Sequence, residues 1–343
     1  MTCDAMEALL YDKQEKQAVR CRLCNHRCAI KDGRRGICGV RENRGGRLET
    51  LVYDKVVARN IDPLEKKPLF HFYPGSLSYS IGTVGCNFRC RFCQNADIAH
   101  MVQDGKSAIM GHALSPQQMV EEALRAGCKS ISYTYTEPTV FFELALDTAR
   151  LAHDKGLKNV FVTNGYMSRE ALEMVAPFLD AANVDLKAFT EDFYDTQCGA
   201  KLAPVLETLR GMHEMGIFIE VTTLVIPGLN DDAGELGSLA EFIVQELGEH
   251  TPWHVSRFHP TYQLTDRPAT DVSKLMEARR IGLEKGLRYV FTGNVPGAGT
   301  ESTACPSCGN EVIVRRGFSV SQNRVSNNRC PDCGGEVHGI GLG

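Results

Sequence analysis

The chain has 343 residues, of which 43% are hydrophobic and 23% charged, and its formal net charge at pH 7 is −4. This length suits one large domain with appendages or two domains, and the composition is that of an ordinary soluble protein. The charge provides no basic field for nucleic acid, no apolar run is long enough to span a membrane, and the charged N-terminus lacks the apolar core of a secretory signal. We therefore expect a cytoplasmic protein that partners neither nucleic acid nor membrane.

Residues 1–75 are predicted to form a Cys-rich, metal-binding N-terminal extension. The segment opens with a helix-like stretch and shows no other long periodic pattern. It carries Cys21, Cys24, Cys28 and Cys38, the last within the Gly- and Arg-rich sequence "KDGRRGICGVRENRGG".

Residues 76–296 alternate short β-rich apolar runs with amphipathic helical runs. The predicted strands are 78–84, 130–135, 158–163, 182–187, 217–226 and 253–258, and the predicted helices are 115–127, 138–156, 168–179, 202–216 and 235–248. This alternation is typical of a parallel sheet with right-handed crossovers. Six units are too few for an eight-stranded barrel, so the fold class expected is α/β, as an open partial (β/α)6 barrel. A doubly wound sheet is the alternative.

Residues 297–343 form a small Gly- and Cys-rich C-terminal module. Its two "CPxCG" knuckles contain Cys305, Cys308, Cys330 and Cys333, and 21 residues separate the two Cys-x2-Cys pairs. This spacing is typical of a zinc ribbon, in which four thiolates bind Zn²⁺ and stabilise the module. A mononuclear iron site is the alternative.

Cysteine usage indicates metal binding in the rest of the chain as well. In a reducing cytosol, disulfides are rare and dense, regularly spaced cysteines indicate metal. Eleven of the 14 cysteines fall in three clusters, whereas Cys3, Cys128 and Cys198 stand apart and are interpreted as thiols without a role. The N-terminal cluster, with His26 nearby, suits either zinc or an auxiliary four-iron cluster. We favour zinc there, because nothing in the sequence requires an internal electron relay.

The middle cluster has three cysteines, Cys86, Cys90 and Cys93, spaced Cys-x3-Cys-x2-Cys in "GCNFRCRFCQN". Zinc completed by a distant His and a ferredoxin-type cluster completed by a remote Cys are two interpretations, but the spacing matches neither ferredoxin pattern. The motif directly follows the first predicted strand, where a βα barrel places its active site. Three thiolates leave one metal coordination position open, which is a catalytic feature.

This motif in this position resembles that of radical S-adenosylmethionine (SAM) enzymes. The resemblance implies a [4Fe-4S] cluster whose fourth iron binds the amino and carboxylate groups of SAM. It also implies one-electron cleavage of SAM to a 5′-deoxyadenosyl radical.

The same resemblance extends to the ends of later strands. In "YTYTEPT", Glu137 stands where the family's Gly-Gly-Glu motif contacts the SAM amino group, although Tyr135 and Thr136 replace the glycines. The resemblance implies that Glu137 accepts a hydrogen bond from the SAM ammonium. The plain alternative is an acidic residue at a helix N-terminus beside Pro138.

Further residues match segments of pyruvate formate-lyase activating enzymes and are implied to line the SAM or substrate site. They are Phe92, Asn164, Asp185, Lys187 and His259, found in "RFCQN", "FVTNG", "VDLK" and "RFHP". The plain alternatives are a turn residue for Asn164, a strand-end ion pair for Asp185 and Lys187, and a structural role for His259.

From Cys21 to the C-terminus, the segments "DPLEKKPLFHFYPGS", "NVDLKAF", "PGLNDD" and "RFHPTYQL" most resemble radical SAM enzymes of the AmmeMemoRadiSam system. The resemblance implies Memo-type and AMMECR1-domain proteins as partners, and an external electron donor such as flavodoxin or ferredoxin. It leaves the small-molecule or peptide substrate unidentified. A glycyl-radical-enzyme activase and a non-catalytic metal-binding adaptor are the alternative functions.

Overall fold

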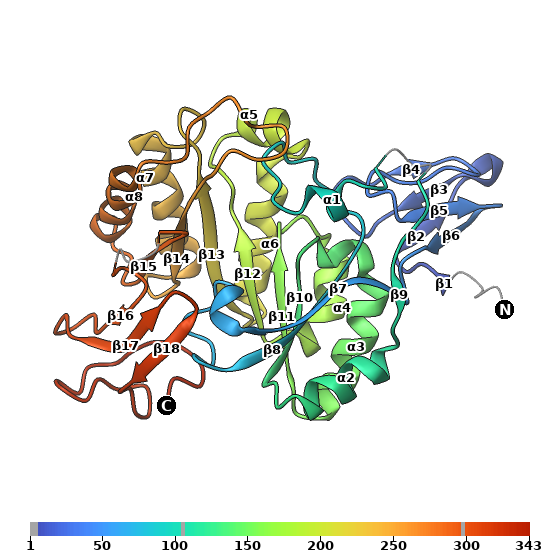
Figure 1. Ribbon diagram of the computed structural model, residues 1–343. Coiled ribbons are helices and arrows are strands. Elements are labelled where there is room, and N and C mark those ends of the chain that lie inside the picture. The colour runs from blue at the N-terminus through green and yellow to red at the C-terminus, as the bar shows by residue number, and fades with distance from the viewer. Residues whose placement is uncertain (1–5, 104–106, 296–298) are drawn as a thin grey trace.

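The structure is a computed structural model that describes residues 6–103, 107–295 and 299–343. A nine-stranded sheet occupies the middle of the molecule (Figure 1). Two small N-terminal sheets lie on one side of it, and a small C-terminal sheet lies on the opposite side, in red.

Seven strands of the central sheet are parallel and follow one another in chain order, without the reversal of order that defines a doubly wound sheet. They are β8 (Leu77–Thr83), β10 (Ser130–Tyr133), β11 (Lys158–Thr163), β12 (Ala181–Asp185), β13 (Phe218–Val225), β14 (Trp253–Arg257) and β15 (Val290–Gly293). The first six confirm the strands expected from the sequence. The seventh, β15, was not expected from the sequence.

Helices connect these strands and cover the outer face of the sheet (Figure 1). They are α2 (Pro116–Arg125), α3 (Phe142–Asp154), α4 (Arg169–Val175), α6 (Leu202–Glu214), α7 (Ala233–Phe242) and α8 (Val272–Glu284), with the short α1 (Ala96–Ala99) and α5 (Glu191–Phe193) between them. The first five confirm the helices expected from the sequence, and α8 was not expected. The start of α2 is fixed by a capping box, in which Ser115 accepts from the Gln118 amide and the Gln118 side chain accepts from the Ser115 amide.

An antiparallel edge covers the outer side of β8. Strand β7 (Lys55–Pro63) pairs with β8, and the two-residue β9 (His112–Ala113) pairs with β7. The edge of the parallel strands is therefore hydrogen-bonded along its length rather than exposed.

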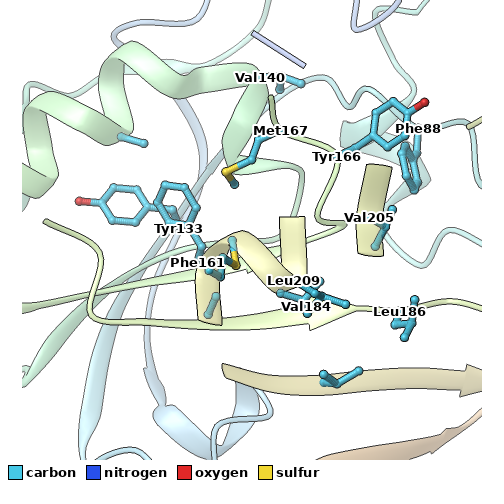
Figure 2. Packing of buried hydrophobic residues seen from close by; sticks show 14 of the residues in the cluster. Phe88, Tyr133, Val140, Phe161, Tyr166, Met167, Val184, Leu186, Val205 and Leu209 are labelled. Atoms are coloured by element: carbon cyan, nitrogen blue, oxygen red, sulfur yellow. The ribbon is translucent and has the colours of Figure 1, made fainter. Parts of the chain in front are cut away.

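The core lies between the parallel strands and their helices. Tyr133 of β10 and Phe161 of β11 pack with ring centroids 5.3 Å apart, and both are fully buried (Figure 2). The inner face is filled at one end by residues 64–72, where Asn183 of β12 donates to the Pro68 carbonyl at 2.8 Å. Buried Glu220 of β13 accepts from the His71 amide at 2.7 Å. Residues 64–72 thus pack against one face of the parallel strands.

The N-terminal part folds as two three-stranded sheets. One contains β1 (Met6–Glu7), β6 (Arg47–Thr50) and β5 (Arg41–Arg44), and the other contains β2 (Tyr11–Lys13), β3 (Val19–Cys21) and β4 (Ala29–Ile30). The expectation of a helix-like opening stretch is wrong for the described residues, which form β1, β2 and one 3-10 turn at Glu15–Gln17. Pairing with β6 and β3 overrides the weak helical propensity of so short a segment.

The C-terminal part forms one sheet of β16 (Thr303–Ala304), β17 (Glu311–Arg316) and β18 (Ser319–Asn323). The boundary predicted between residues 296 and 297 lies outside the described residues, as does Cys3. The sheet docks on the segment that fills the interior: buried Arg315 donates to the Phe70 carbonyl, and the His71 imidazole contacts the Thr303 hydroxyl at 3.0 Å. In the described part of the chain, no helix has both the length and the apolar character that crossing a membrane requires.

Candidate active site

The three-cysteine loop follows β8 directly, at the carboxyl edge of the parallel strands. Gly85 has φ +97°, and a Cβ there would lie 2.6 Å from a methyl group of Val40, so only glycine fits where the loop crosses the N-terminal sheet. The loop backbone is held on its other side by the turn after α5, through Arg89 N–H to Cys198 O (2.8 Å) and Arg91 N–H to Gln197 O (3.0 Å). The loop is therefore fixed between two elements.

The surroundings of Cys86, Cys90 and Cys93 act on the three thiols in different directions, and burial raises the pKa of Cys93 to about 11. The Phe88 amide donates to the Cys86 sulfur at 3.4 Å. A hydrogen bond from Cys198 lowers the pKa of the Cys90 thiol, burial opposes this, and the Lys187 ammonium adds to the lowering. Burial and the Glu137 carboxylate raise the pKa of Cys86. Three thiols from one loop, with amide and ammonium groups facing them, fit the donor set of an iron–sulfur cluster.

Glu137 ties the ends of β10 and β11 together. Its carboxylate is 2% exposed and accepts from the Thr139 amide (3.0 Å), the Thr139 hydroxyl (2.5 Å), the Thr163 hydroxyl (2.8 Å) and the Asn164 amide (2.8 Å). Burial raises its pKa, and these donors oppose the rise. The carboxylate thus already has four protein donors, and its contact with the SAM ammonium stays a prediction.

Asn164 lies at the carboxyl end of β11 and faces the three-cysteine loop. Its side-chain amide donates to the Asn87 side-chain oxygen at 2.7 Å and lies 3.9 Å from the Cys86 sulfur. Its own oxygen accepts from the Tyr166 amide at 3.1 Å, which is the turn role considered as the alternative. Asn164 therefore both shapes the turn and contacts the loop beside Cys86.

Asp185 and Lys187 lie at the end of β12 and form an ion pair of 2.9 Å. Although burial opposes charge on Lys187, the Asp185 carboxylate raises the pKa of its ammonium well above the usual value. The ammonium also lies 5.9 Å from the centre of the Phe92 ring. The carbonyl of Lys187 accepts from the side-chain amide of buried Asn230, in the "PGLNDD" segment, at 2.6 Å. A rigidly held cation is thus presented beside the loop that carries Cys90.

The carboxyl ends of β8, β10, β11 and β12 therefore bring together most of the predicted site residues. Those so gathered are Cys86, Cys90, Cys93, Phe92, Glu137, Asn164, Asp185 and Lys187. His259 follows β14 and is exposed, and none of the contacts described above reaches it.

Three residues of the site were not expected from the sequence. Asn87 lies between the loop and Asn164, and Cys198, interpreted as a thiol without a role, contacts Cys90. Tyr135 has φ +68°, a left-handed conformation that glycine adopts without strain. Its carbonyl accepts from Asn95 at 2.7 Å, and its hydroxyl donates to Asp62 at 2.7 Å. The one signal available in the sequence was the replacement of a family glycine by Tyr135.

The C-terminal cysteines form a compact group. The sulfurs of Cys305, Cys308, Cys330 and Cys333 all lie within 4.8 Å of one another, with Cys305–Cys333 at 3.7 Å and Cys308–Cys330 at 3.8 Å. A tetrahedral ion with metal–sulfur bonds of about 2.3 Å sets its sulfurs about 3.8 Å apart. The group therefore has the dimensions of a site for a single tetrahedral metal ion.

The N-terminal cysteines are arranged differently. Cys21, Cys24, Cys28 and Cys38 line one cavity together with His26 and Arg41. The two ends of the chain thus gather four cysteines each, in one case closely packed and in the other around an open space.

Comparison with known proteins agrees with this arrangement. The family model described as "Radical SAM superfamily" matches residues 80–240. An uncharacterized protein of Methanocaldococcus jannaschii, MJ0808, is 45% identical over 333 residues, which cover 96% of this chain and 98% of that protein. A pyruvate formate-lyase-activating enzyme of Clostridium pasteurianum is 22% identical over 218 residues, covering 60% of this chain and 88% of the enzyme. The crystal structure of a radical SAM methyltransferase from Sphaerobacter thermophilus aligns with a TM-score of 0.51 and 18% identity, over 69% of this chain and 71% of that one, and so shares its fold.

Proposed function

Because residues 80–240 match the family model of the radical SAM superfamily, we propose that this chain is a radical SAM enzyme in which Cys86, Cys90 and Cys93 hold a [4Fe-4S] cluster whose open iron binds SAM. When bound, the two supply a 5′-deoxyadenosyl radical by one-electron reductive cleavage, and this radical abstracts hydrogen from a small-molecule or peptide substrate. The observation that carries the proposal is the position of the three-cysteine loop at the carboxyl edge of the parallel strands, facing Asn164 and Lys187.

The chain's own residues prepare this site. Lys187, held by Asp185 and by the carbonyl contact to Asn230, presents a fixed positive charge toward negatively charged groups of SAM or substrate. Glu137 joins the ends of β10 and β11 and so fixes Asn164 against the loop. The buried ring of Phe92 offers an apolar surface beside Cys93 for the adenine. His259 remains a proposed SAM contact, and the parallel strands are proposed to form a partial barrel.

The flanking parts are proposed to be an N-terminal metal-binding extension at residues 1–75, whose last part pairs with the central sheet through β7, and a C-terminal module at residues 297–343. The close packing of the C-terminal sulfurs supports one zinc ion bound by that module. From the sequence resemblance we likewise propose that the chain is a member of the AmmeMemoRadiSam system, with Memo-type and AMMECR1-domain proteins as partners. We also propose a flavodoxin or ferredoxin as the electron donor and a cytoplasmic location.

A glycyl-radical-enzyme activase is the second candidate function. It is favoured by the similarity to activating enzymes, including a putative glycyl-radical enzyme activating enzyme of M. jannaschii, MJ1632, which is 24% identical over 59% of this chain. The N- and C-terminal sheets lie on opposite sides of the central sheet (Figure 1). On our proposal they limit the approach of a large protein substrate. We therefore rank abstraction from a small molecule or peptide first.

The test is anaerobic incubation of the reconstituted protein with SAM and dithionite, with 5′-deoxyadenosine quantified. The parent protein should form 5′-deoxyadenosine, Cys90→Ala should form none, and the control Cys128→Ala, a buried cysteine outside the site, should match the parent. Undiminished formation by Cys90→Ala would remove the cluster assignment. Deuterium labelling decides between the two functions. Transfer of deuterium into 5′-deoxyadenosine from a labelled small molecule or peptide supports the first function, and transfer from a labelled glycyl-radical enzyme supports the second.

A further inference from the structure

The N-terminal cysteines converge on one cavity from separate parts of the two small sheets. Cys21 ends β3, Cys24 forms an isolated bridge with Met167 next to the active-site turn, and Cys28 and Cys38 follow on the intervening loops. All four line the cavity, which is also bounded by Asn87 of the three-cysteine loop. Convergence of four thiols on a shared space indicates an inorganic occupant rather than four unrelated buried cysteines.

The spacing of the sulfurs separates this group from the C-terminal one. Among the residues that the structure describes, the four C-terminal cysteines are the only set of three or more Cys, His, Asp or Glu whose ligand atoms all lie within 4.8 Å of one another. The N-terminal cysteines instead line a cavity, and their sulfurs do not gather within that distance. One tetrahedral zinc draws its four sulfurs together, whereas in a four-iron cluster each thiolate binds its own iron and the sulfurs stay apart.

Two buried donors at the cavity support an occupant with sulfur acceptors. Arg41 is 1% exposed and donates to the Cys21 sulfur at 3.3 Å, while its guanidinium is paired with buried Glu143. Asn87 is also 1% exposed, and its side-chain NH2 group has no hydrogen-bond partner among the described residues, although its oxygen is engaged by Asn164. A buried donor left without an acceptor costs about 1–3 kcal/mol, which a ligand in the cavity would recover.

The cavity adjoins the active-site loop. His26, in its lining, contacts the Asn87 carbonyl at 2.7 Å, and the Cys38 carbonyl lies 2.9 Å from where a Cβ of Gly85 would be. Gly85 and Asn87 are the two neighbours of Cys86 in the chain. A group bound in the cavity is therefore separated from the Cys86 ligand by little more than one residue.

From these observations we propose that Cys21, Cys24, Cys28 and Cys38 bind a second iron–sulfur cluster, not the single zinc that the sequence favoured, and that this cluster passes electrons to the active site. The transfer rests on the proposed function. A one-electron reductant such as flavodoxin or ferredoxin is oxidised, the second cluster is reduced, and the same electron moves to the cluster at Cys86, Cys90 and Cys93. The second cluster returns to its oxidised state.

The site is tested in a loop variant that combines Cys86→Ala, Cys90→Ala and Cys93→Ala. After anaerobic reconstitution it should keep about two to four iron atoms with equal sulfide, an iron–sulfur absorption band, and one zinc. Adding Cys24→Ala should remove the iron and sulfide and leave the zinc, whereas adding Cys128→Ala should leave the iron, sulfide and zinc contents unchanged. Two zinc ions without iron, or iron without sulfide, would overturn the proposal.

Should the loop variant fail to fold, Cys24→Ala alone provides the same answer. It should lose the second cluster's share of iron and still show a SAM-dependent change in its reduced paramagnetic resonance spectrum. An iron content equal to that of the parent would refute the second cluster. If the spectrum of the parent protein itself did not change with SAM, the proposed function would be refuted, but the proposal of a second cluster would not be affected.

Electron transfer is tested by the rate at which the SAM-binding cluster is reduced. In Cys24→Ala, reduction by flavodoxin should be slower than in the parent, while reduction by the small molecule dithionite should be unchanged. Equal rates with flavodoxin in both proteins would refute the relay.

Discussion

Replacing Glu137 with glutamine tests how the ends of β10 and β11 are held together. The carboxylate accepts three hydrogen bonds on one oxygen and one, from the Asn164 amide, on the other. Glutamine keeps the shape and one acceptor oxygen, but its NH2 group must face one of these donors. The orientation that preserves most bonds places NH2 against the Asn164 amide.

The magnitude follows from this count. The Asn164 amide loses its acceptor inside the protein, and the three remaining bonds change from charge-assisted to neutral; recovery of the carboxylate's burial cost offsets part of the loss. We expect a net loss of about 2–4 kcal/mol in the free energy of unfolding. At about 2–4 °C per kcal/mol, this lowers Tm by roughly 5–15 °C.

Thermal unfolding without SAM measures this effect, with Glu121→Gln, an exposed glutamate on α2, as the matched control. Calorimetric titration with SAM runs in parallel, since a direct bond from Glu137 to the SAM ammonium would lower affinity by roughly one to two orders of magnitude. An unchanged Tm with SAM affinity reduced in that range would refute the structural role and establish direct SAM binding.

Three further outcomes are expected. Glu143→Gln leaves the Arg41 guanidinium buried without its carboxylate and should lower stability by about 3–5 kcal/mol, whereas Glu173→Gln, in an exposed pair, should change unfolding little; equal effects would contradict the burial argument. Cys308→Ala should release one zinc and make the C-terminal sheet sensitive to proteolysis while iron content stays unchanged; full zinc retention would contradict the ribbon site. Burial lowers the pKa of His71 to about 4, so between pH 6.5 and about 4 the unfolded chain binds a proton that the folded protein excludes. The free energy of unfolding should therefore fall by up to about 3 kcal/mol as pH decreases through that window. His71→Gln should flatten this pH dependence, and an unchanged slope would exclude His71 as its source.

The parallel strands and their helices were predictable because each is a local pattern. The runs that became β8 and β10 to β14 are apolar and rich in β-branched or aromatic residues, and the helices between them have an apolar face. The short N-terminal strands of two to four residues were not predictable, since so few residues carry no periodicity. Pairing with distant partners, such as Met6 with Thr50, determines those strands instead.

The gathering of candidate residues at the carboxyl edge of the strands was predictable where a residue type and a strand end coincide, as for Cys86 and Lys187. It was not predictable where a contact joins distant segments. Nothing in the sequence connects Cys198 to Cys90, or Asn87 to the N-terminal cavity, because both contacts depend on how loops pack in three dimensions. The choice between zinc and an iron–sulfur cluster likewise depended on the spacing of sulfurs, which sequence intervals do not determine.

The most direct test of the central proposal, an open iron held by three cysteines, is titration of SAM into the dithionite-reduced protein, followed by electron paramagnetic resonance. The parent protein is predicted to show a cluster signal that SAM changes and saturates. The loop variant lacking Cys86, Cys90 and Cys93 is predicted to show only a signal that SAM leaves unaltered. A parent signal indifferent to SAM, or a SAM-dependent signal that persists in the loop variant, would contradict the account.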